Sequence, residues 1–212
     1  MSRVPVAVLV SGSGTNLAAL LESTSAADSL AEIVLVVADR HKAYGLQRAR
    51  DAGVATEVVL KRDHPTPEAY DQALAAVLQR HGVEWVCLAG FMKLVGAAML
   101  AAFPQRILNI HPSLLPAFPG LGVQQAAIEH GVRAAGATVH LVDGGMDTGP
   151  IVVQGVVEVH PDDSPEELSA RILTKVEHRI YPMALRWAVQ GKLRLRGRVV
   201  HVDTDEPLLV VG

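Results

Sequence analysis

The sequence has little cysteine, few aromatic residues and no long apolar run. One cysteine, Cys87, among 212 residues excludes an intramolecular disulfide framework and a metal site built on paired cysteines. A lone cysteine fits a reducing, cytoplasmic compartment. Aromatic residues make up 4% of the chain, so bases of single-stranded nucleic acid would find few stacking partners. The first apolar run, residues 4–10, is too short to cross a bilayer. We therefore expect a cytoplasmic protein whose partners include neither a membrane nor a nucleic acid.

An excess of positive charge is also lacking. The 19 Lys and Arg residues face 22 Asp and Glu residues, which gives a net charge of -3. Proteins that bind nucleic-acid backbones are usually basic, although this balance leaves room for a local site that binds one phosphate. No HExxH motif accompanies the 9 histidines, so we expect no metal. No GxSxG nucleophile motif occurs either, which favours direct group transfer through a tetrahedral intermediate.

Short apolar runs alternate with helical patterns over the first two-thirds of the chain. Strands are expected at residues 4–10, 32–38, 56–60, 84–89 and 106–110, and helices at 16–21, 44–52, 67–81 and 96–103. Nearly continuous apolar strands are typical of parallel sheets that are covered on both faces. The pattern predicts an α/β fold with a doubly wound, mainly parallel sheet and helices on both faces, in one domain that spans residues 1–212. Ligands of such sheets bind beyond the carboxyl ends of the strands.

The last third of the chain no longer alternates short strands with helices. Strands are expected at 137–142 and 151–159, and a small hairpin at 194–201 around Gly197. Ser164 and Glu167 form a capping box with Pro165 at the first helical position. Pro182 is expected to break or kink the helix that follows near Tyr181. The apolar tail, residues 207–211, is either a strand or an interface.

The first candidate site is the loop Ser11–Asn16, with the sequence SGSGTN, directly after the first strand. Backbone N–H groups at the start of a helix favour an anion, and glycines allow a phosphate to approach closely. Position 17 is Leu17 rather than the third glycine of a dinucleotide motif, and no Gly-Lys-Ser/Thr follows. The loop therefore indicates a phosphate monoester, and the alternative is an ordinary tight turn with Asn16 as the helix cap.

The second candidate is Asn109 with His111, where the fifth strand ends. Residues i and i+2 of an extended chain point to the same side, so both side chains are expected to face one cleft. An amide next to an imidazole can stabilise an oxyanion and transfer a proton. The alternative is a structural histidine at a strand end.

The third candidate is Asp147 in the glycine-rich loop 143–150. A carboxylate beside an imidazole orients it and favours its charged form. An Asp- and Gly-rich turn is also common without any function. The loop matters for function if it folds over His111.

These motifs together resemble one enzyme family. Residues 10–17, 88–94 and 109–116, together with DTGP at 147–150, resemble the phosphoribosylglycinamide formyltransferases, in order along nearly the whole chain. The resemblance implies a Rossmann-like formyltransferase fold. It also implies that the chain transfers a formyl group from 10-formyltetrahydrofolate, its co-substrate, to the amine of glycinamide ribonucleotide in purine biosynthesis, without a metal.

The resemblance also assigns roles to residues. Asn109 would bind the formyl oxygen of the folate, His111 would stabilise the oxyanion, and Asp147 would orient His111 and a water molecule. Gly14, Thr15, Asn16 and Glu177 match positions that bind the ribotide and its phosphate, whereas Met92, Lys93, Leu94 and Val95 match the folate pocket.

The chain departs from the family at Pro67, where many members carry an arginine associated with the folate tail. Arg62 and His64 are the candidates to replace it. The resemblance also raises a cis peptide at Leu115–Pro116, although sequence alone favours trans. A formyltetrahydrofolate hydrolase of the same fold and a non-catalytic binding module stay open as alternatives, as do a monomer and a homodimer.

Overall fold

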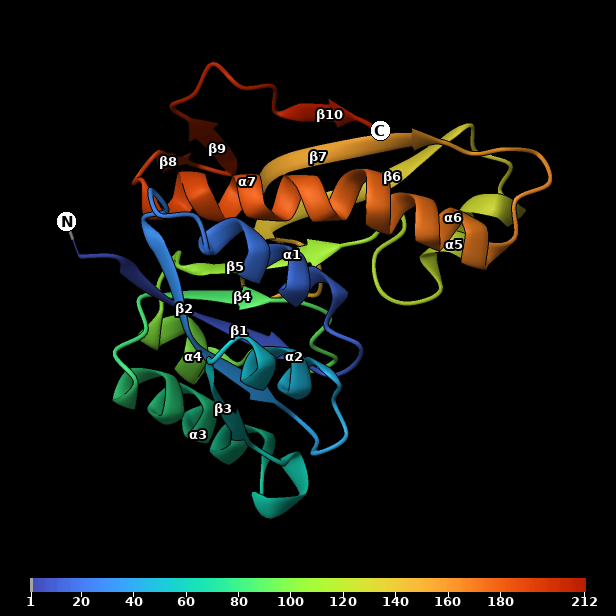
Figure 1. Ribbon diagram of the computed structural model, residues 1–212. Coiled ribbons are helices and arrows are strands. Elements are labelled where there is room, and N and C mark those ends of the chain that lie inside the picture. Colours follow the sequence, from blue (N-terminus) through green and yellow to red (C-terminus); the bar gives the residue numbers. More distant parts are fainter. Residues whose placement is uncertain (1) are drawn as a thin grey trace. The chain divides into compact units, whose positions relative to one another are not determined.

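The computed structural model describes residues 2–212 and divides the chain into two compact units. The first unit ends at Asn109, and the second begins at Ile110. Each unit has its own set of strands and helices (Figure 1). The organisation of residues 1–212 as one domain stays a prediction.

The first unit is an alternation of strands and helices. Its elements are β1 (Val4–Val10), α1 (Thr15–Thr24), β2 (Ala31–Ala38), α2 (Gly45–Asp51), β3 (Ala55–Val58), the 3-10 turn η1 (Lys61–Asp63), α3 (Pro67–Arg80), β4 (Trp85–Leu88), α4 (Ala97–Ala102) and β5 (Ile107–His111), whose last two residues belong to the second unit. The strand order is β3-β2-β1-β4-β5, and every pair is parallel. The predicted parallel α/β sheet is confirmed.

Strands β2 and β3 lie on one side of β1 in the sheet, and β4 and β5 lie on the other side. Helices α1 and α2 pack on each other, and so do α3 and α4. Right-handed crossovers that run in opposite directions from β1 put these two helix pairs on opposite faces of the sheet. Both faces of β1 are therefore covered, and Val6 to Val10 are completely buried. The carboxyl ends of the parallel strands meet at one edge, which is the expected place for a ligand.

The second unit is mixed in direction. Its elements are α5 (Val123–Glu129), β6 (Ala134–Leu141), β7 (Ile151–Glu158), α6 (Pro165–Ile172), the π-helical turn η2 (Leu173–Glu177), α7 (His178–Val189), β8 (Leu193–Arg196), β9 (Val199–Val202) and β10 (Leu209–Val211). Strands β6 and β7 are antiparallel, while β10 pairs with β7 in parallel. The apolar tail thus contains a strand. Strands β8 and β9 form the predicted hairpin around Gly197.

The helical segment that begins after Ser164 starts as predicted but continues further along the chain than predicted. Glu167 N–H donates to the Ser164 hydroxyl at 3.2 Å, and Ser164 N–H donates to the Glu167 carboxylate at 2.9 Å, which confirms the capping box. Pro182 was expected to break or kink the helix; the break is wrong, because α7 runs on to Val189. The hydrogen bond that proline cannot donate would reach His178, the first residue of α7. The missing hydrogen bond therefore falls where α7 follows the π-helical turn η2.

Two further features of the backbone are notable. Gly53 and Gly82 follow α2 and α3 with φ of 72° and 66°, as expected for glycines that end helices. The Leu115–Pro116 peptide bond is cis. Within residues 2–212, no helix combines the length and the apolar character that a membrane span requires.

Candidate functional site

The second unit brings His111 and Asp147 together. His111 ends β5 and its side chain is 7% exposed, while Asp147 lies on the loop between β6 and β7. His111 Nδ1 is 3.4 Å from Asp147 Oδ2, and Nε2 is 3.0 Å from the Phe118 carbonyl oxygen. Both ring nitrogens therefore face oxygen atoms that can accept a hydrogen bond. The loop does fold over His111, as the third candidate required.

Sequence reasoning missed a second histidine beside Asp147. His140 Nε2 is 3.9 Å from Asp147 Oδ1, and His140 Nδ1 is 2.9 Å from the Leu141 carbonyl oxygen. Burial lowers the pKa of His140 below its ordinary value, and the neighbouring His111 lowers it further, against the opposing effects of Leu141 and Asp147. Because a carbonyl oxygen can only accept, Nδ1 is the atom that donates to Leu141. A histidine in a largely apolar strand was the available signal.

Asp147 is fixed by its own unusual backbone and by a neighbouring loop. Its φ is 54°, a left-handed conformation that is rare outside glycine, and Phe118 has a φ of 51°. Gly120 N–H donates to Asp147 Oδ2 at 3.0 Å. Two residues in unfavourable conformations therefore flank His111, which indicates that the surrounding structure determines this geometry closely.

The rest of the Asp147 loop is held by short polar contacts. Asp143 accepts hydrogen bonds from the Thr148 hydroxyl at 2.6 Å and from Gly145 N–H at 3.0 Å. Arg198, in the turn between β8 and β9, donates to the Thr148 carbonyl at 2.6 Å. A Cβ atom at Gly149 would lie 1.6 Å from the Leu141 carbonyl oxygen. The glycine is required there because the loop passes directly against β6.

The segment that leaves His111 is anchored through Thr138. The buried Thr138 hydroxyl donates to the Ser113 carbonyl at 2.7 Å and accepts from Leu115 N–H at 3.0 Å. Gln154 Nε2 donates both to Thr138 Oγ1 and to the Leu115 carbonyl, each at 3.0 Å. Residues 113–115 are thereby fixed to β6 and β7, and this limits the movement of His111.

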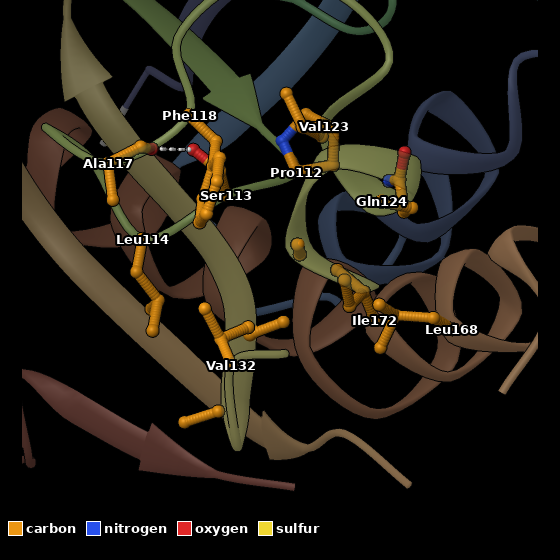
Figure 2. Close-up of a pocket in the computed structure, with 13 residues that line it drawn as sticks. Pro112, Ser113, Leu114, Ala117, Phe118, Val123, Gln124, Val132, Leu168 and Ile172 are labelled. Carbon is orange, nitrogen blue, oxygen red and sulfur yellow. Dashed lines mark hydrogen bonds between the residues drawn. The ribbon is translucent and has the colours of Figure 1, made fainter. Parts of the chain in front are cut away.

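An apolar cavity lies beside the same segment. Its volume is about 140 Å³, and Pro112, Ser113 and Phe118 form part of its wall together with residues of α5, α6 and β6 (Figure 2). The Ser113 hydroxyl already donates to the Ala117 carbonyl at 2.7 Å. The cavity lining is therefore almost entirely apolar and offers no charged group for chemistry.

The first unit contains most of the other predicted residues, beginning with Asn109. It is half-buried in β5, two positions before His111 on that strand. Alternation along an extended strand directs their side chains to the same side. The strand-end placement of both residues agrees with the prediction.

The loop Ser11–Asn16 connects β1 to α1. Gly14 is the N-cap of α1 with a φ of 69°, so Asn16, two positions into the helix, is not the cap that the alternative interpretation required. The first helical hydrogen bond runs from Ala18 N–H to the Gly14 carbonyl. The amides of Thr15 and Asn16 precede it, at the positive end of the helix dipole.

Two contacts fix the shape of this loop. A Cβ atom on Gly14 would be 2.7 Å from Gly45 Cα, so the glycine is needed for close packing as well as for its positive φ. Arg48 Nε donates to the Ser13 carbonyl at 2.8 Å, and its guanidinium lies 5.0 Å from the centre of the Tyr44 ring. Sequence reasoning missed Arg48, which brings a cation to the loop from α2.

The segment Met92–Val95 follows β4 in the first unit. Met92 and Leu94 are 56% and 69% exposed, and Lys93 is half-buried. Met92 N–H donates to the Ser11 hydroxyl at 2.9 Å, so this segment contacts the loop Ser11–Asn16 directly. Its backbone is therefore better placed than its side chains to define a ligand site.

Glu177 lies in the second unit, at the end of the π-helical turn η2. The residue is 7% exposed, which is unusual for a glutamate. π-Helical turns occur frequently at functional sites. Among residues 2–212, no group of three or more His, Cys, Asp or Glu side chains is arranged to hold a metal ion.

The two units offer different chemistry. The first presents backbone amides at a helix start, suited to a phosphate, while the second presents a buried imidazole and carboxylate, suited to proton transfer.

Comparisons with known proteins give the following findings. A family model described as "Formyl transferase" matches residues 4–185. The phosphoribosylglycinamide formyltransferase of Haemophilus influenzae is 39% identical over 93% of this chain and 93% of its own length. The trifunctional purine biosynthetic protein adenosine-3 of Drosophila pseudoobscura pseudoobscura is 44% identical, and the match covers 97% of this chain but 15% of that protein. The crystal structure of glycinamide ribonucleotide transformylase 1 from Symbiobacterium toebii matches with a TM-score of 0.92 and 51% identity, over 94% of each chain.

Proposed function

Because the chain belongs to the formyl transferase family, we propose that it is an enzyme that transfers the formyl group of 10-formyltetrahydrofolate to the amine of glycinamide ribonucleotide. The acceptor amine attacks the formyl carbon, a tetrahedral intermediate forms, and the C–N bond to the folate nitrogen breaks. The observation that carries this proposal is the buried His111–Asp147 pair, with His111 Nδ1 3.4 Å from Asp147 Oδ2.

His111 supplies the proton-bearing group. Its Nε2 lies 3.0 Å from the Phe118 carbonyl, and in the reaction the formyl oxygen takes the place of that carbonyl as hydrogen-bond partner. The proton on Nε2 then stabilises the negative charge that develops on the formyl oxygen. Asp147 orients the ring from Nδ1 and stabilises the imidazolium. Asp147 also organises the water molecule that carries the proton lost by the amine to the departing folate nitrogen.

Asn109 supplies a second donor to the formyl oxygen. Its side-chain amide can donate a hydrogen bond to an oxyanion, and its position on β5, two residues before His111, supports this role. A donor fixed by a strand needs no reorganisation during the reaction. Asn109 therefore both binds formyl-folate and stabilises the transition state.

The loop Ser11–Asn16 supplies the phosphate site for the ribotide. Gly14, Thr15 and Asn16 present backbone amides at the start of α1, a helix of 10 residues. Arg48, which donates to Ser13, adds positive charge next to this loop. We assign Glu177 to the ribotide as well, because its buried carboxylate suits the polar groups of a sugar or amine.

The segment Met92–Val95 supplies the folate site. Its exposed side chains indicate that backbone N–H and C=O groups recognise the pterin, and Asn109 adds a contact at the formyl group. Pro67 is the first residue of α3 and carries no charge for the folate tail. Arg62 lies in η1, and its side chain is 78% exposed. A carboxylate of the folate tail could therefore reach it.

The proposal includes a cytoplasmic enzyme of purine biosynthesis that uses one-carbon units and binds no nucleic acid. A homodimer is the alternative to a monomer, and sedimentation velocity at micromolar concentration distinguishes them.

The test compares formyl release with and without the acceptor. Loss of 10-formyltetrahydrofolate is followed by absorbance, first alone and then with glycinamide ribonucleotide. Transfer predicts release that depends on the ribotide and that saturates with it. Equal release without the ribotide would instead indicate the hydrolase of the same fold, and binding of both compounds without any release would indicate a binding module.

A further inference from the structure

We propose that Asp39 is a positioning residue that couples the loop Ser11–Asn16 to the segment Met92–Val95, so that a ligand at either one strengthens binding at the other. The inference rests on the proposed function, which assigns the ribotide phosphate to the loop and formyl-folate to the segment. All of the residues involved belong to the first unit.

Asp39 is placed where ligands of parallel sheets bind. It directly follows β2, at the carboxyl end of a parallel strand, and its side chain is 1% exposed. A buried carboxylate is costly unless donors surround it, because it loses its hydration. The contacts of Asp39 therefore matter for the geometry around it.

Three polar residues stabilise the charged carboxylate of Asp39. Arg40 donates from Nε to Oδ1 at 2.9 Å and from Nη2 to Oδ2 at 3.2 Å. Lys93 Nζ is 3.3 Å from Oδ2, and the Ser11 hydroxyl helps to lower the pKa of the same carboxylate. Burial alone would raise the pKa of Asp39, but the donors Arg40, Ser11 and Lys93 outweigh it and lower the pKa below its ordinary value. The group is thus an ionised carboxylate with two of its three partners in the two ligand-binding segments.

Ser11 makes the connection continuous. Its hydroxyl helps to lower the pKa of Asp39, its oxygen accepts from Met92 N–H at 2.9 Å, and its own N–H donates to the Gly90 carbonyl at 3.2 Å. Asp39 therefore reaches the loop through Ser11 and reaches the segment by two routes, through Ser11 to Met92 and directly through Lys93. A shift of the loop cannot leave the segment unchanged.

The far end of the segment has a different anchor. Asp71, from α3, accepts hydrogen bonds from Gly96 N–H at 2.7 Å and from Met99 N–H at 3.0 Å, at the start of α4. The residues between the two anchors pack little, since two of their apolar side chains are more than half exposed. Asp39 and Asp71 thus define the position of Met92–Val95, but of these two contacts only the one at Asp39 extends to Ser11.

This arrangement predicts cooperative binding. A ligand that fixes the loop also restricts Ser11, and through Asp39 it restricts the segment, so the second ligand has less freedom left to lose. Coupling between sites typically changes affinity by about 5–150-fold, and the effect is reciprocal. We expect at least about a 5-fold effect here.

The test measures this coupling by calorimetry. The dissociation constant of tetrahydrofolate is determined with and without saturating glycinamide ribonucleotide, for the wild type and for Asp39→Asn. The wild type is expected to bind tetrahydrofolate at least about 5-fold more tightly when the ribotide is present. In Asp39→Asn the factor is expected to fall below about 2, because the amide keeps the shape but loses the charge that binds Lys93.

Two variants serve as controls. Asp71→Asn removes the other anchor of the segment, so it should weaken tetrahydrofolate binding while the coupling factor persists. Asp163→Asn removes a carboxylate of the second unit whose side chain is 4% exposed and paired with Arg171. The side chain of Asp163 is about as little exposed as that of Asp39. Its substitution should lower stability without a change in coupling.

The outcomes are distinct. Coupling of wild-type size in Asp39→Asn, or a wild type without coupling, overturns this inference. No ribotide-dependent release of formyl by the wild type overturns the proposed function and this inference with it, whereas normal release with unchanged coupling in the variant overturns this inference alone. If Asp39→Asn does not fold by circular dichroism, Ser11→Ala, which removes the bridging hydroxyl, must show the same loss of coupling.

Discussion

The functional segments of the two units present different chemical groups. In the first, the loop Ser11–Asn16 and the segment Met92–Val95 present backbone groups, and glycines and a buried carboxylate define their shape. In the second, His111 and Asp147 present side chains, and loops in unusual backbone conformations hold them 3.4 Å apart. Backbone sites tolerate changes of side chain, whereas a proton-transfer pair does not. Substitutions in the second unit should therefore have the larger effects.

The largest effect is expected from His111→Ala. Without the imidazole the developing oxyanion keeps only the Asn109 amide as a donor, so kcat should fall by about 10²–10⁴-fold. Steady-state kinetics with both substrates measures this effect. The KM values should change much less, because the loop Ser11–Asn16 and the segment Met92–Val95 are intact. A variant with nearly normal kcat would refute the role of His111.

Gly149→Ala should damage the same centre through the backbone. The added Cβ would lie 1.6 Å from the Leu141 carbonyl oxygen, so the loop that bears Asp147 has to move. We expect a loss of at least about 3 kcal/mol in unfolding free energy and a strong loss of kcat. Chemical denaturation and kinetics measure the two effects.

Gly144→Ala is the matched control. It lies on the same loop, and a Cβ there would meet nothing within 4 Å. Its stability and activity should equal those of the wild type. Equal damage by both substitutions would mean that loop flexibility, and not the contact with Leu141, is what the glycines supply.

Thr138→Val should loosen the segment after His111 without any change in shape. It removes the hydroxyl that pairs with the Ser113 carbonyl and with Leu115 N–H, in a completely buried position. Leaving both groups unpaired should lower stability by about 2 kcal/mol or more and should lower kcat moderately. Urea denaturation checks the stability, and Thr138→Ser, which keeps the hydroxyl, should retain most of it.

The second unit also contains an ion pair, Asp163 with Arg171, whose effect on stability can be measured at acid pH apart from the catalytic pair. Arg171 lowers the pKa of Asp163 from 3.8 to about 2. Because the folded pKa lies below the unfolded one, the ion pair stabilises the protein above about pH 4, and this contribution is lost as the pH falls towards 2. The difference in unfolding free energy between wild type and Asp163→Asn should therefore shrink between pH 5 and pH 2, in roughly that window. A constant difference would contradict the assignment.

The smallest effect is expected from Leu94→Ala in the first unit. Leu94 is 69% exposed, and the backbone is the part of this segment assigned to folate recognition. The KM for formyl-folate should rise by less than about 3-fold, with kcat unchanged, in keeping with the small cost of most surface substitutions. A loss comparable to that of His111→Ala would remove the contrast between the two units.

Local patterns in the sequence predicted much of the first unit. The apolar run of β1 gave its bounds, Val4–Val10, without error, because a strand buried on both faces leaves an unbroken apolar signal. Asn109 and His111 were found because a strand end is a known position for ligands and the period of two puts both on one side.

Contacts between distant residues could not be predicted in the same way. Nothing local indicates that Asp39 meets Lys93, 54 positions later in the chain, or that His140 lies next to Asp147. The helix across Pro182 was missed for a related reason, because the π-helical turn before it has no clear sequence signature. The resemblance to a family suggested the site residues, but it could not show which contacts fix them.

The most direct test of the proposed reaction follows the formyl carbon itself. Tetrahydrofolate carrying a ¹³C-labelled formyl group is incubated with the enzyme and an equal amount of glycinamide ribonucleotide, and carbon NMR records where the label goes. Formyl transfer predicts that the folate signal is replaced, one for one, by the signal of a formamide on the ribotide. A label that accumulates as free formate while the ribotide stays unchanged would contradict it.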